Sequence, residues 1–397
     1  MMEESAQKYD YTEFSLVRGG LLYQCLLYLR LMRPNLEPLY CRALFFALLA
    51  WLPLLVLSAV QGMAWGGSIK VPLLYDLTEM TRFLLSVPLL IMAERVVDYR
   101  SNEVIRHFIE SDLIDEEELP QYEAIVRKTM AMVKALPVEG IIVVLVILNT
   151  IFLPFEFSEL TTTWQFLVSS AGPERTPAGW WYLAVSIPIF QFLMGRWIYR
   201  YLVWCSFLWR VSRLKLRLIA THPDRVGGLA FLGVLQVKFC PIIFALAALV
   251  SAYVGREILF GGAGLQQYRM MILGDIIFLV LIFLGPYLVF SMQLFKAKER
   301  GFLAYSGLAN DYTFSFHRKW IRKENPNREQ LLGTSDIQSL ADIANSFAIV
   351  RDMRIMPFDL QTTIVPFAAC AIIPFLPLLF LVFPVQEIVV KFMEILL

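Results

Sequence analysis

The chain has 397 residues, of which 58% are hydrophobic and only 17% are charged. A soluble domain has about 45–50% apolar and about 25% charged residues. The mean hydropathy of +0.60 is too high for apolar side chains that fill only water-facing cores, so these values exclude a soluble enzyme. The formal net charge is +1, and without bulk basic character we expect no nucleic-acid partner.

The cysteines and histidines form no metal-binding pattern. The five cysteines occur singly, without a CxxC pair, and the three histidines lie nearly a hundred residues or more apart. Neither a disulfide framework nor a zinc site has the spacing that it needs, so we expect no metal and no cofactor. The polar, acidic start MMEESAQKYDYTEF lacks the features of a secretory signal, and the first span is expected to direct the chain to the membrane.

Seven segments are candidates for membrane-spanning helices, which need about 20 mostly apolar residues to cross a bilayer. Six of them carry at most one acidic residue: 43–60, 135–155 with Glu139, 176–195, 239–255, 270–295 with Asp275, and 360–383. The seventh, 71–93, contains Asp76, Glu79 and Arg82, and its alternative is a half-span or an interfacial helix. The sequence predicts an all-α polytopic membrane protein with about seven transmembrane helices plus amphipathic and cytoplasmic helices.

Lysine and arginine residues set the expected orientation, because short basic loops are retained in the cytoplasm. With the N-terminus inside, the inside segments carry 29 of these residues and the outside segments 5, a split that favours keeping the seventh span. The C-terminus is then outside. The chain then divides into four parts. Residues 1–42 are a cytoplasmic N-terminal region with an interfacial helix, and residues 43–295 hold six spans together with a cytoplasmic hairpin (94–135) and a basic stalk and HPD loop (196–238). Residues 296–358 are a cytoplasmic helical segment, and residues 359–397 are the last span with an amphipathic C-terminal helix.

The fourth span is expected to continue as a cytoplasmic stalk. Between residues 179 and 220 only Gly195 interrupts the helical pattern, and a helix of about 40 residues is about 60 Å long, twice the hydrocarbon thickness. Arg210, Arg213 and Arg217 would then lie along one face. The favoured interpretation is that these arginines snorkel and contact anionic lipid.

Further helices are expected outside the spans. After Gly333, Ser335 and Gln338 form a capping-box pattern, and Pro357 ends the helix that follows. An apolar stripe with helical spacing is expected to pack on a neighbouring helix; it consists of Ile337, Leu340, Ala344, Phe347 and Val350. Two amphipathic helices are expected at 21–33, before the first span, and at 384–397, on the outer surface.

The string THPDRVGGLAFL lies between the fourth and fifth spans on the expected cytoplasmic side. Its proline and its two glycines are typical of a turn before the next helix. A functional interpretation uses the histidine and the aspartate to handle protons, or the glycines as backbone donors to an anion beside an arginine. The residues concerned are His222, Asp224, Arg225, Gly227 and Gly228.

Three strings carry a resemblance to a known family. The segments RALFFALLAWLPLLVLSAVQGMAWGG, THPDRVGGLAFLG and GTSDIQSLADIANSFAIVRDMR resemble bacterial multi-pass inner-membrane proteins with an HPDRxGGL loop motif, a family of unknown function. The resemblance runs along most of the chain, from about residue 18 to residue 384. It implies a bacterial inner-membrane location and supports the architecture, and it implies no substrate, cofactor or catalytic residue.

Ionisable residues within the spans carry the remaining signal, because a charge near the bilayer centre costs at least about 2.5–3.5 kcal/mol and usually faces a partner or a wet cavity. Four lie at expected depths in the outer half of the membrane, namely Asp76, Glu79, Arg82 and Asp275. Three lie near the inner side, namely Glu139, Arg196 and Arg200. Two charged layers indicate a polar route with a narrow apolar middle. The alternative is that these charges pair with one another and hold the helices together.

The leading hypothesis is a channel or transporter for an ion or small solute, assembled as a homo-oligomer. The alternative is a membrane scaffold or sensor that receives a cytoplasmic partner on the basic stalk, the 94–135 hairpin and the helix after Ser335. The third hypothesis is a membrane enzyme that acts on lipid at the HPD loop. The sequence does not decide whether the chain is an enzyme, but without a Ser/His/Asp set or a metal spacing this hypothesis is the least favoured.

Overall fold

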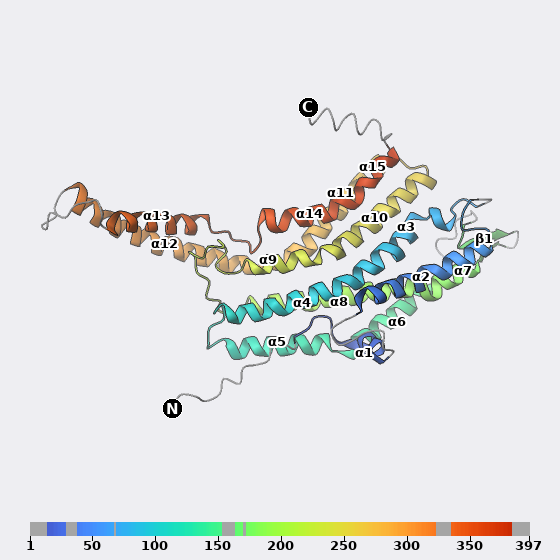
Figure 1. The fold of residues 1–397 in the computed structure, drawn as a ribbon, viewed down its shortest axis with the longest axis horizontal. Coiled ribbons are helices and arrows are strands. Elements are labelled where there is room, and N and C mark those ends of the chain that lie inside the picture. The colour runs from blue at the N-terminus through green and yellow to red at the C-terminus, as the bar shows by residue number, and fades with distance from the viewer. Residues whose placement is uncertain are drawn as a thin grey trace.

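A computed structural model describes residues 14–28, 38–66, 69–152, 163–169, 172–322 and 335–382. Helices make up nearly all of the regular structure of these residues, and Figure 1 shows them as an elongated bundle. Six helical stretches are long and apolar enough to cross a membrane. The chain is therefore an integral membrane protein of the all-α class, and its spanning helices contact lipid.

Each of the six stretches overlaps one of the six nearly charge-free spans predicted from the sequence, and several extend well beyond it. Most of them are built from successive helical segments. The first three, in chain order, are Leu39–Val60 (α2), Leu119–Phe152 (α5, Leu119–Val133; α6, Leu136–Phe152) and Pro177–Val211 (α7, Pro177–Trp181; η5, Tyr182–Ser186; α8, Ile187–Val211). The fourth is Phe231–Phe260 (α9, Phe231–Gln236; η6, Val237–Phe239; α10, Cys240–Phe260), and the fifth is Leu265–Ile321 (α11, Leu265–Leu284; η7, Gly285–Phe290; α12, Ser291–Phe316; η8, His317–Ile321). The sixth is Leu360–Leu381 (η9, Leu360–Ile364; α14, Val365–Ile372; η10, Ile373–Phe375; α15, Leu376–Val382).

The seventh predicted span, 71–93, is helical but is not one of these apolar stretches. Its segments are η2 (Leu73–Tyr75), α3 (Leu77–Met80), the π-helical η3 (Thr81–Ser86) and α4 (Val87–Glu110). The last three form a continuous helix that packs against α2, α8 and α10. The acidic side chains of the segment, Asp76 and Glu79, are buried, so this part of the helix faces the interior of the bundle.

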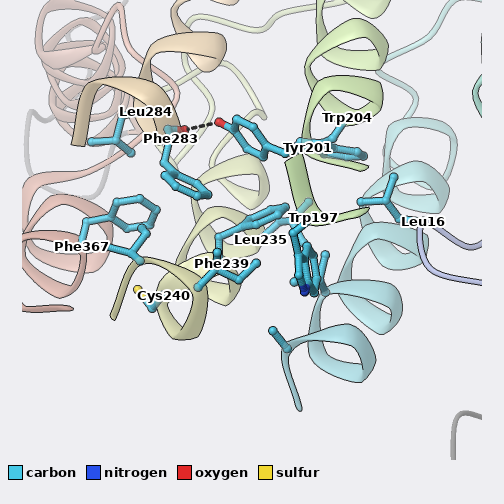
Figure 2. Close-up of a cluster of buried hydrophobic side chains, with 14 of the residues drawn as sticks. Leu16, Trp197, Tyr201, Trp204, Leu235, Phe239, Cys240, Phe283, Leu284 and Phe367 are labelled. Atoms are coloured by element: carbon cyan, nitrogen blue, oxygen red, sulfur yellow. Dashed lines mark hydrogen bonds between the residues drawn. The ribbon is translucent and has the colours of Figure 1, made fainter. Parts of the chain in front are cut away.

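The centre of the bundle is α8, which packs against α4, α5 and α6. Figure 2 shows its residue Tyr201 beside Phe239 and Phe283, with ring centroids 5.5 and 4.8 Å away. The Tyr201 hydroxyl donates to the main-chain oxygen of Phe283 at 3.1 Å, and Trp204 Nε1 donates to the Tyr287 hydroxyl at 3.0 Å. These contacts tie α8 to the fourth and fifth spanning stretches.

The stalk predicted for residues 179–220 is wrong in its last part, residues 212–220, because the helix ends at Val211. The chain beyond it is extended and pairs with the turn between α4 and α5. In that pairing the backbone N–H of Arg217 donates to the oxygen of Leu113 at 2.9 Å. The three arginines expected on one helical face therefore do not share it: Arg210, Arg213 and Arg217.

The element that extends beyond the bundle is the pair of α12 and α13 (Ser335–Asp352), which lie side by side in Figure 1. We call this pair the arm. The helix from Leu265 to Ile321 has 57 residues and is therefore about 85 Å long. Pro286 does not end this helix, because the 3-10 segment η7 accommodates it.

Helix α13 packs on α12 through only part of the predicted stripe. The ring of Phe347 lies 5.3 Å from that of Phe302 of α12, and Val350 is fully buried. Ile337 is 45% exposed and Ala344 is also exposed, so the prediction is wrong for these two residues.

Polar contacts at the start of α13 account for this rotation. The Asp336 carboxylate accepts hydrogen bonds from Lys319 Nζ at 3.0 Å and Trp320 Nε1 at 2.9 Å. The Tyr312 hydroxyl donates to the main-chain oxygen of Asp336 at 2.7 Å. Because neighbouring residues of a helix point about 100° apart, the inward Asp336 turns Ile337 away from α12.

Two predicted helices near the ends are described in part or not at all. α1 (Gly20–Tyr28) covers the first part of the predicted helix 21–33. The rest of that helix and the predicted tail helix 384–397 lie outside the described residues. A short antiparallel hairpin of β1 (Phe166–Ser169) and β2 (Gly172–Arg175), which the sequence did not predict, lies beside α7 at the end opposite the arm in Figure 1.

Gly195 lets α6 approach α8 closely. A Cβ at this position would lie 2.8 Å from Cγ2 of Ile142, whereas a Cβ at Gly274 of α11 would meet nothing within 4 Å. We expect Gly195→Leu to force the helices apart and to destabilise the protein by about 1–3 kcal/mol. The matched control Gly274→Leu should stay within about 0.5 kcal/mol of the unchanged protein. Tryptophan fluorescence during unfolding in detergent measures both, and equal effects would contradict the prediction.

Candidate functional site

Five charged side chains meet between α2, α4, α6 and α8, toward the side that the basic residues assign to the cytoplasm. We call them the inner cluster; they are Arg42, Glu94, Glu139, Arg196 and Arg200. Each side chain is 9% exposed or less. The cluster thus gathers the three inner residues predicted from the sequence and adds Arg42 and Glu94.

Glu94 is the centre of the inner cluster, because its carboxylate contacts all three arginines. Its Oε2 lies 2.6 Å from Arg42 Nη2, and its Oε1 lies 2.9 Å from Arg200 Nη1 and 3.4 Å from Arg196 Nη1. Arg196 Nε also donates to Glu139 Oε1 at 2.8 Å. Burying an ion costs several kcal/mol unless opposite charges replace its water, so these pairings make the contact between the four helices specific.

Glu139 also holds the start of α1. Its Oε2 accepts a hydrogen bond from the backbone N–H of Leu22 at 2.9 Å, which places a negative charge at the positive end of a helix. Gly20 has a φ of 88°, and a Cβ there would lie 2.2 Å from Glu139 Oε1. The close approach of this carboxylate therefore requires glycine.

A second buried group lies at the other end of the same helices. We call it the outer cluster; it consists of Asp76, Glu79, Arg82, Trp164 and Tyr182. Arg82 Nη1 lies 2.6 Å from Glu79 Oε1 and donates to the Tyr182 hydroxyl at 2.9 Å. That hydroxyl in turn donates to Glu79 Oε1 at 2.9 Å. Trp164 Nε1 donates to Asp76 Oδ2 at 3.1 Å, so the cluster as described holds two carboxylates and one guanidinium.

Several polar atoms around the outer cluster are buried without a hydrogen-bond partner among the described residues. They belong to α2, to α3 and η3, and to α7 and α8, and they are Trp51 Nε1, Ser58 Oγ, Thr78 Oγ1, Arg82 Nε, Trp181 Nε1 and Gln191 Oε1. Helix α2 packs against η3, α7 and η5, so these atoms belong to neighbouring elements. A buried polar group without a partner is costly and normally signals a bound water or ion. The outer half of the bundle is therefore polar beyond its charged residues.

Asp275 is separate from the outer cluster. It lies on α11, which packs against α10 and α14. Its Oδ2 is buried and has no hydrogen-bond partner among the described residues. The sequence predicts this carboxylate at the depth of Asp76 and Glu79, but none of the described contacts joins it to them.

The stretch between the two clusters is mostly apolar. Arg82 and Glu94 are 12 residues apart on one continuous helix, which is about 18 Å. The buried side chains between them include Phe83, Val87 and Leu90. A cleft of about 360 Å³ lies between α4 and α9, and none of its lining residues belongs to either cluster. This cleft therefore does not join the two clusters.

The HPD loop is a turn tied together by Asp224. Its carboxylate accepts hydrogen bonds from the backbone N–H groups of Val226 at 2.8 Å, Gly228 at 3.1 Å and Ala230 at 3.1 Å. Gly227 and Gly228 have φ values of 64° and 98°, and Arg225 has a φ of 59°. These glycines are thus needed for the left-handed backbone of the turn.

Asp224 contacts His222 as well, since His222 Nδ1 lies 2.8 Å from Asp224 Oδ1. Burial raises the pKa of the Asp224 carboxyl, but the three backbone N–H groups and His222 outweigh it and leave the pKa lowered. The carboxylate is therefore a stable anion committed to the loop backbone. The backbone N–H of Gly228 points to this carboxylate and is not available to an external anion.

Two members of the inner cluster, Arg42 and Glu94, were not predicted from the sequence, because they lie just outside the predicted spans. Arg42 lies one residue before the predicted span 43–60, and Glu94 lies one residue after 71–93, so both are predicted to lie outside the membrane, in the N-terminal region and the hairpin 94–135. Their buried positions follow from packing on α8. Only the presence of Arg196 and Arg200 at a similar depth offered a signal, because two buried arginines need more than one carboxylate.

Comparison of the chain with models of protein families, with curated proteins and with solved structures finds no match. Within the described part of the chain, no group of three or more His, Cys, Asp or Glu side chains is arranged to hold a metal ion. The function is therefore argued from the two clusters and the elements that position them.

Glu94→Gln tests how much the inner cluster contributes to the stability of the protein. Three arginines would then surround a neutral amide, and we expect a loss of about 3–5 kcal/mol of stability, since removing one partner of a buried ion pair leaves uncompensated charge. Glu110→Gln is the matched control, because Glu110 pairs with Arg106 on the protein surface and exposed pairs contribute little. Unfolding in detergent, followed by tryptophan fluorescence, measures both variants. Similar unfolding temperatures for the two variants would refute the assignment.

Asp224→Ala tests the structural role of the loop. Loss of the backbone hydrogen bonds should destabilise the protein by about 1–2 kcal/mol at pH 7. Because folding lowers the pKa of Asp224, this stabilisation is present above the ordinary aspartate value of about 3.9 and is lost as pH falls through the lowered pKa. The difference between the two proteins should therefore shrink below about pH 4. His222→Ala is the control and should change stability far less, because the backbone bonds to Asp224 remain.

Proposed function

We propose that this integral membrane protein is a transporter or channel for an ion or small solute, and that it exchanges protons at the outer cluster. The observation that carries the proposal is the pair of buried carboxylates, Asp76 and Glu79, of which Glu79 pairs with the guanidinium of Arg82.

The electrostatic argument starts from the low dielectric of a buried site. Arg82 neutralises one carboxylate, and a second ionised carboxylate beside it is disfavoured by like charge and by loss of water. One added proton makes the group neutral. Tyr182 bridges Arg82 and Glu79 through its hydroxyl, so a proton on Glu79 would break or reverse a hydrogen bond that joins the Pro177–Val211 stretch to the Leu77–Glu110 helix. Protonation is thereby linked to helix packing.

The partnerless polar atoms around the outer cluster support a site that holds water or a small polar solute. They come from helices on both sides of the charged group, and ordered water commonly satisfies such atoms. Asp275 supports a second protonatable position, because a lone carboxylate within an apolar span is either neutral or in contact with water. The inner cluster, with three arginines and two glutamates, would form the other end of the route.

The proposal includes an orientation and a location. The excess of lysine and arginine on one side, 29 against 5, supports a cytoplasmic N-terminus and an outside C-terminus. The family resemblance supports a bacterial inner membrane. The proposal also includes anionic lipid near Arg210, Arg213 and Arg217, which rests on the charge of these residues alone. It further includes assembly into a homo-oligomer.

Reconstitution into liposomes tests the proposal. A pH gradient is imposed across vesicles that contain a pH-sensitive dye, and proton flux is followed with and without a membrane potential. We expect Asp76→Asn combined with Glu79→Gln to lower the flux at least about tenfold, a change in barrier of about 1.4 kcal/mol or more. Glu110→Gln, which removes an exposed carboxylate, should keep the flux. An unchanged flux in the double variant, with its unfolding temperature intact, would overturn the proposal.

A second candidate function is a scaffold that recruits a cytoplasmic partner, and the arm is the observation that favours it. Its helix α12 with η8 presents apolar side chains that are 61–75% exposed at Leu303, Phe314 and Ile321. If the liposomes carry no proton flux and the chain is folded, the scaffold becomes the better account. The lipid-enzyme hypothesis has less support, because Asp224 is occupied by its own loop.

A further inference from the structure

The segment Phe14–Gly19 is unusual among the described residues because it is not helical and is still deeply buried. Phe14, Leu16 and Val17 are at most 2% exposed. Figure 2 shows Leu16 near Trp204 of α8, on the edge of the aromatic core. We call this segment the strap. Irregular backbone at such a position must find hydrogen bonds within the protein, and its partners identify what it covers.

Most of the polar partners of the strap belong to α4. The Asp98 carboxylate accepts from the Ser15 hydroxyl, from the backbone N–H of Val17 at 3.2 Å and from Arg18 Nε at 3.2 Å. Asn102 Nδ2 donates to the main-chain oxygen of Phe14 at 3.0 Å. Asp98 lies one helical turn beyond Glu94, so the strap lies directly next to the inner cluster.

Arg200 connects the strap to the inner cluster. Its Nη1 donates to Glu94 Oε1 and its Nη2 donates to the main-chain oxygen of Val17, both at 2.9 Å. One guanidinium therefore binds the buried ion network on one side and the strap on the other. Departure of the strap would leave Arg200 without its second partner and would expose Asp98 at the inner end of the bundle.

We infer that the strap is the inner gate of the proposed transport route, closed in the conformation described here. The inference rests on the proposed function and adds its regulation. The strap covers the inner cluster with three apolar side chains and fastens to it through polar contacts with Asp98, Asn102 and Arg200. It contains no cysteine and has no regular secondary structure, so these polar contacts and the burial of Phe14, Leu16 and Val17 hold it.

The geometry also supplies a hinge. Gly19 and Gly20 join the strap to α1, and Gly20 has a φ of 88°. Arg18, at the edge of the strap, keeps a side chain that is 46% exposed while it pairs with Asp98. Arg18 is the exposed residue at the edge of the strap, so release can begin there and proceed toward the buried residues while α1 stays anchored on Glu139.

A disulfide lock tests the gate in the full-length protein. Ser15→Cys combined with Asp98→Cys places two thiols where the hydroxyl and the carboxylate are now in contact. Reduced, this variant lacks the carboxylate that holds the strap, and we expect proton flux at least about tenfold above that of the unchanged protein. Oxidation with copper–phenanthroline should lower the flux below that of the unchanged protein, and dithiothreitol should restore it. Asp98→Cys alone is the control, because the oxidant should leave its flux unchanged.

A labelling experiment follows the strap without measuring transport. Val17 is 1% exposed, so the thiol of Val17→Cys should react slowly with a water-soluble maleimide. We expect the reaction to accelerate at least about tenfold when Asp98→Asn is added. The same protein without Val17→Cys corrects for Cys41, which is exposed.

The two measurements separate the possible failures. If proton flux is measurable but is the same in the oxidised and the reduced Ser15→Cys/Asp98→Cys protein, the gate is overturned and the transport proposal stands. If maleimide labelling accelerates as expected but no variant carries flux, the transport proposal is overturned and the gating role fails with it. If labelling of the Val17→Cys protein does not change with Asp98→Asn, the strap does not leave its site and the gate is overturned.

Discussion

A charge that leaves water inside a membrane must meet an opposite charge or enough hydrogen-bond donors, and this constraint determines how the helices of this protein are placed. Glu94 meets three arginines from α2 and α8, and Glu139 of α6 binds both Arg196 and the start of α1. Shifting any of these helices by one turn would separate a buried ion from its partner. Apolar packing alone permits such shifts, because lipid is as apolar as the helices.

The two clusters differ in the sign of their excess charge. The outer cluster has two carboxylates and one guanidinium, whereas the inner cluster, as described, has three guanidinium groups and two carboxylates. Both lie on the same helices, with apolar side chains between them. Under the proposed transport function, the two ends of the route would interact differently with a proton, and a carrier of that kind needs a conformational step between its two states.

Much of the fold was predictable, because length and hydropathy alone locate a spanning helix. The six apolar spans follow from this rule, and the pairing of Glu139 with Arg196 and of Glu79 with Arg82 was one of two interpretations of the charged residues. Hydropathy does not identify Arg42 or Glu94 as buried. Each stands at the end of an apolar run, where a charge that packs on a neighbouring helix has the same sequence pattern as a charge that faces water. The end of α8 at Val211 also escaped prediction, since it depends on pairing with the turn after α4.

The 57-residue helix that runs from Leu265 through the bilayer to Ile321 would act as a lever. About 30 Å of it spans the hydrocarbon, and the remaining length of about 55 Å extends past the membrane surface. A change of tilt of about 10°, well within the range that bilayers tolerate, would carry the far end sideways by about 10 Å. A small rearrangement around Asp275 would therefore displace the end of the helix at Ile321, and a molecule bound there would be displaced with it.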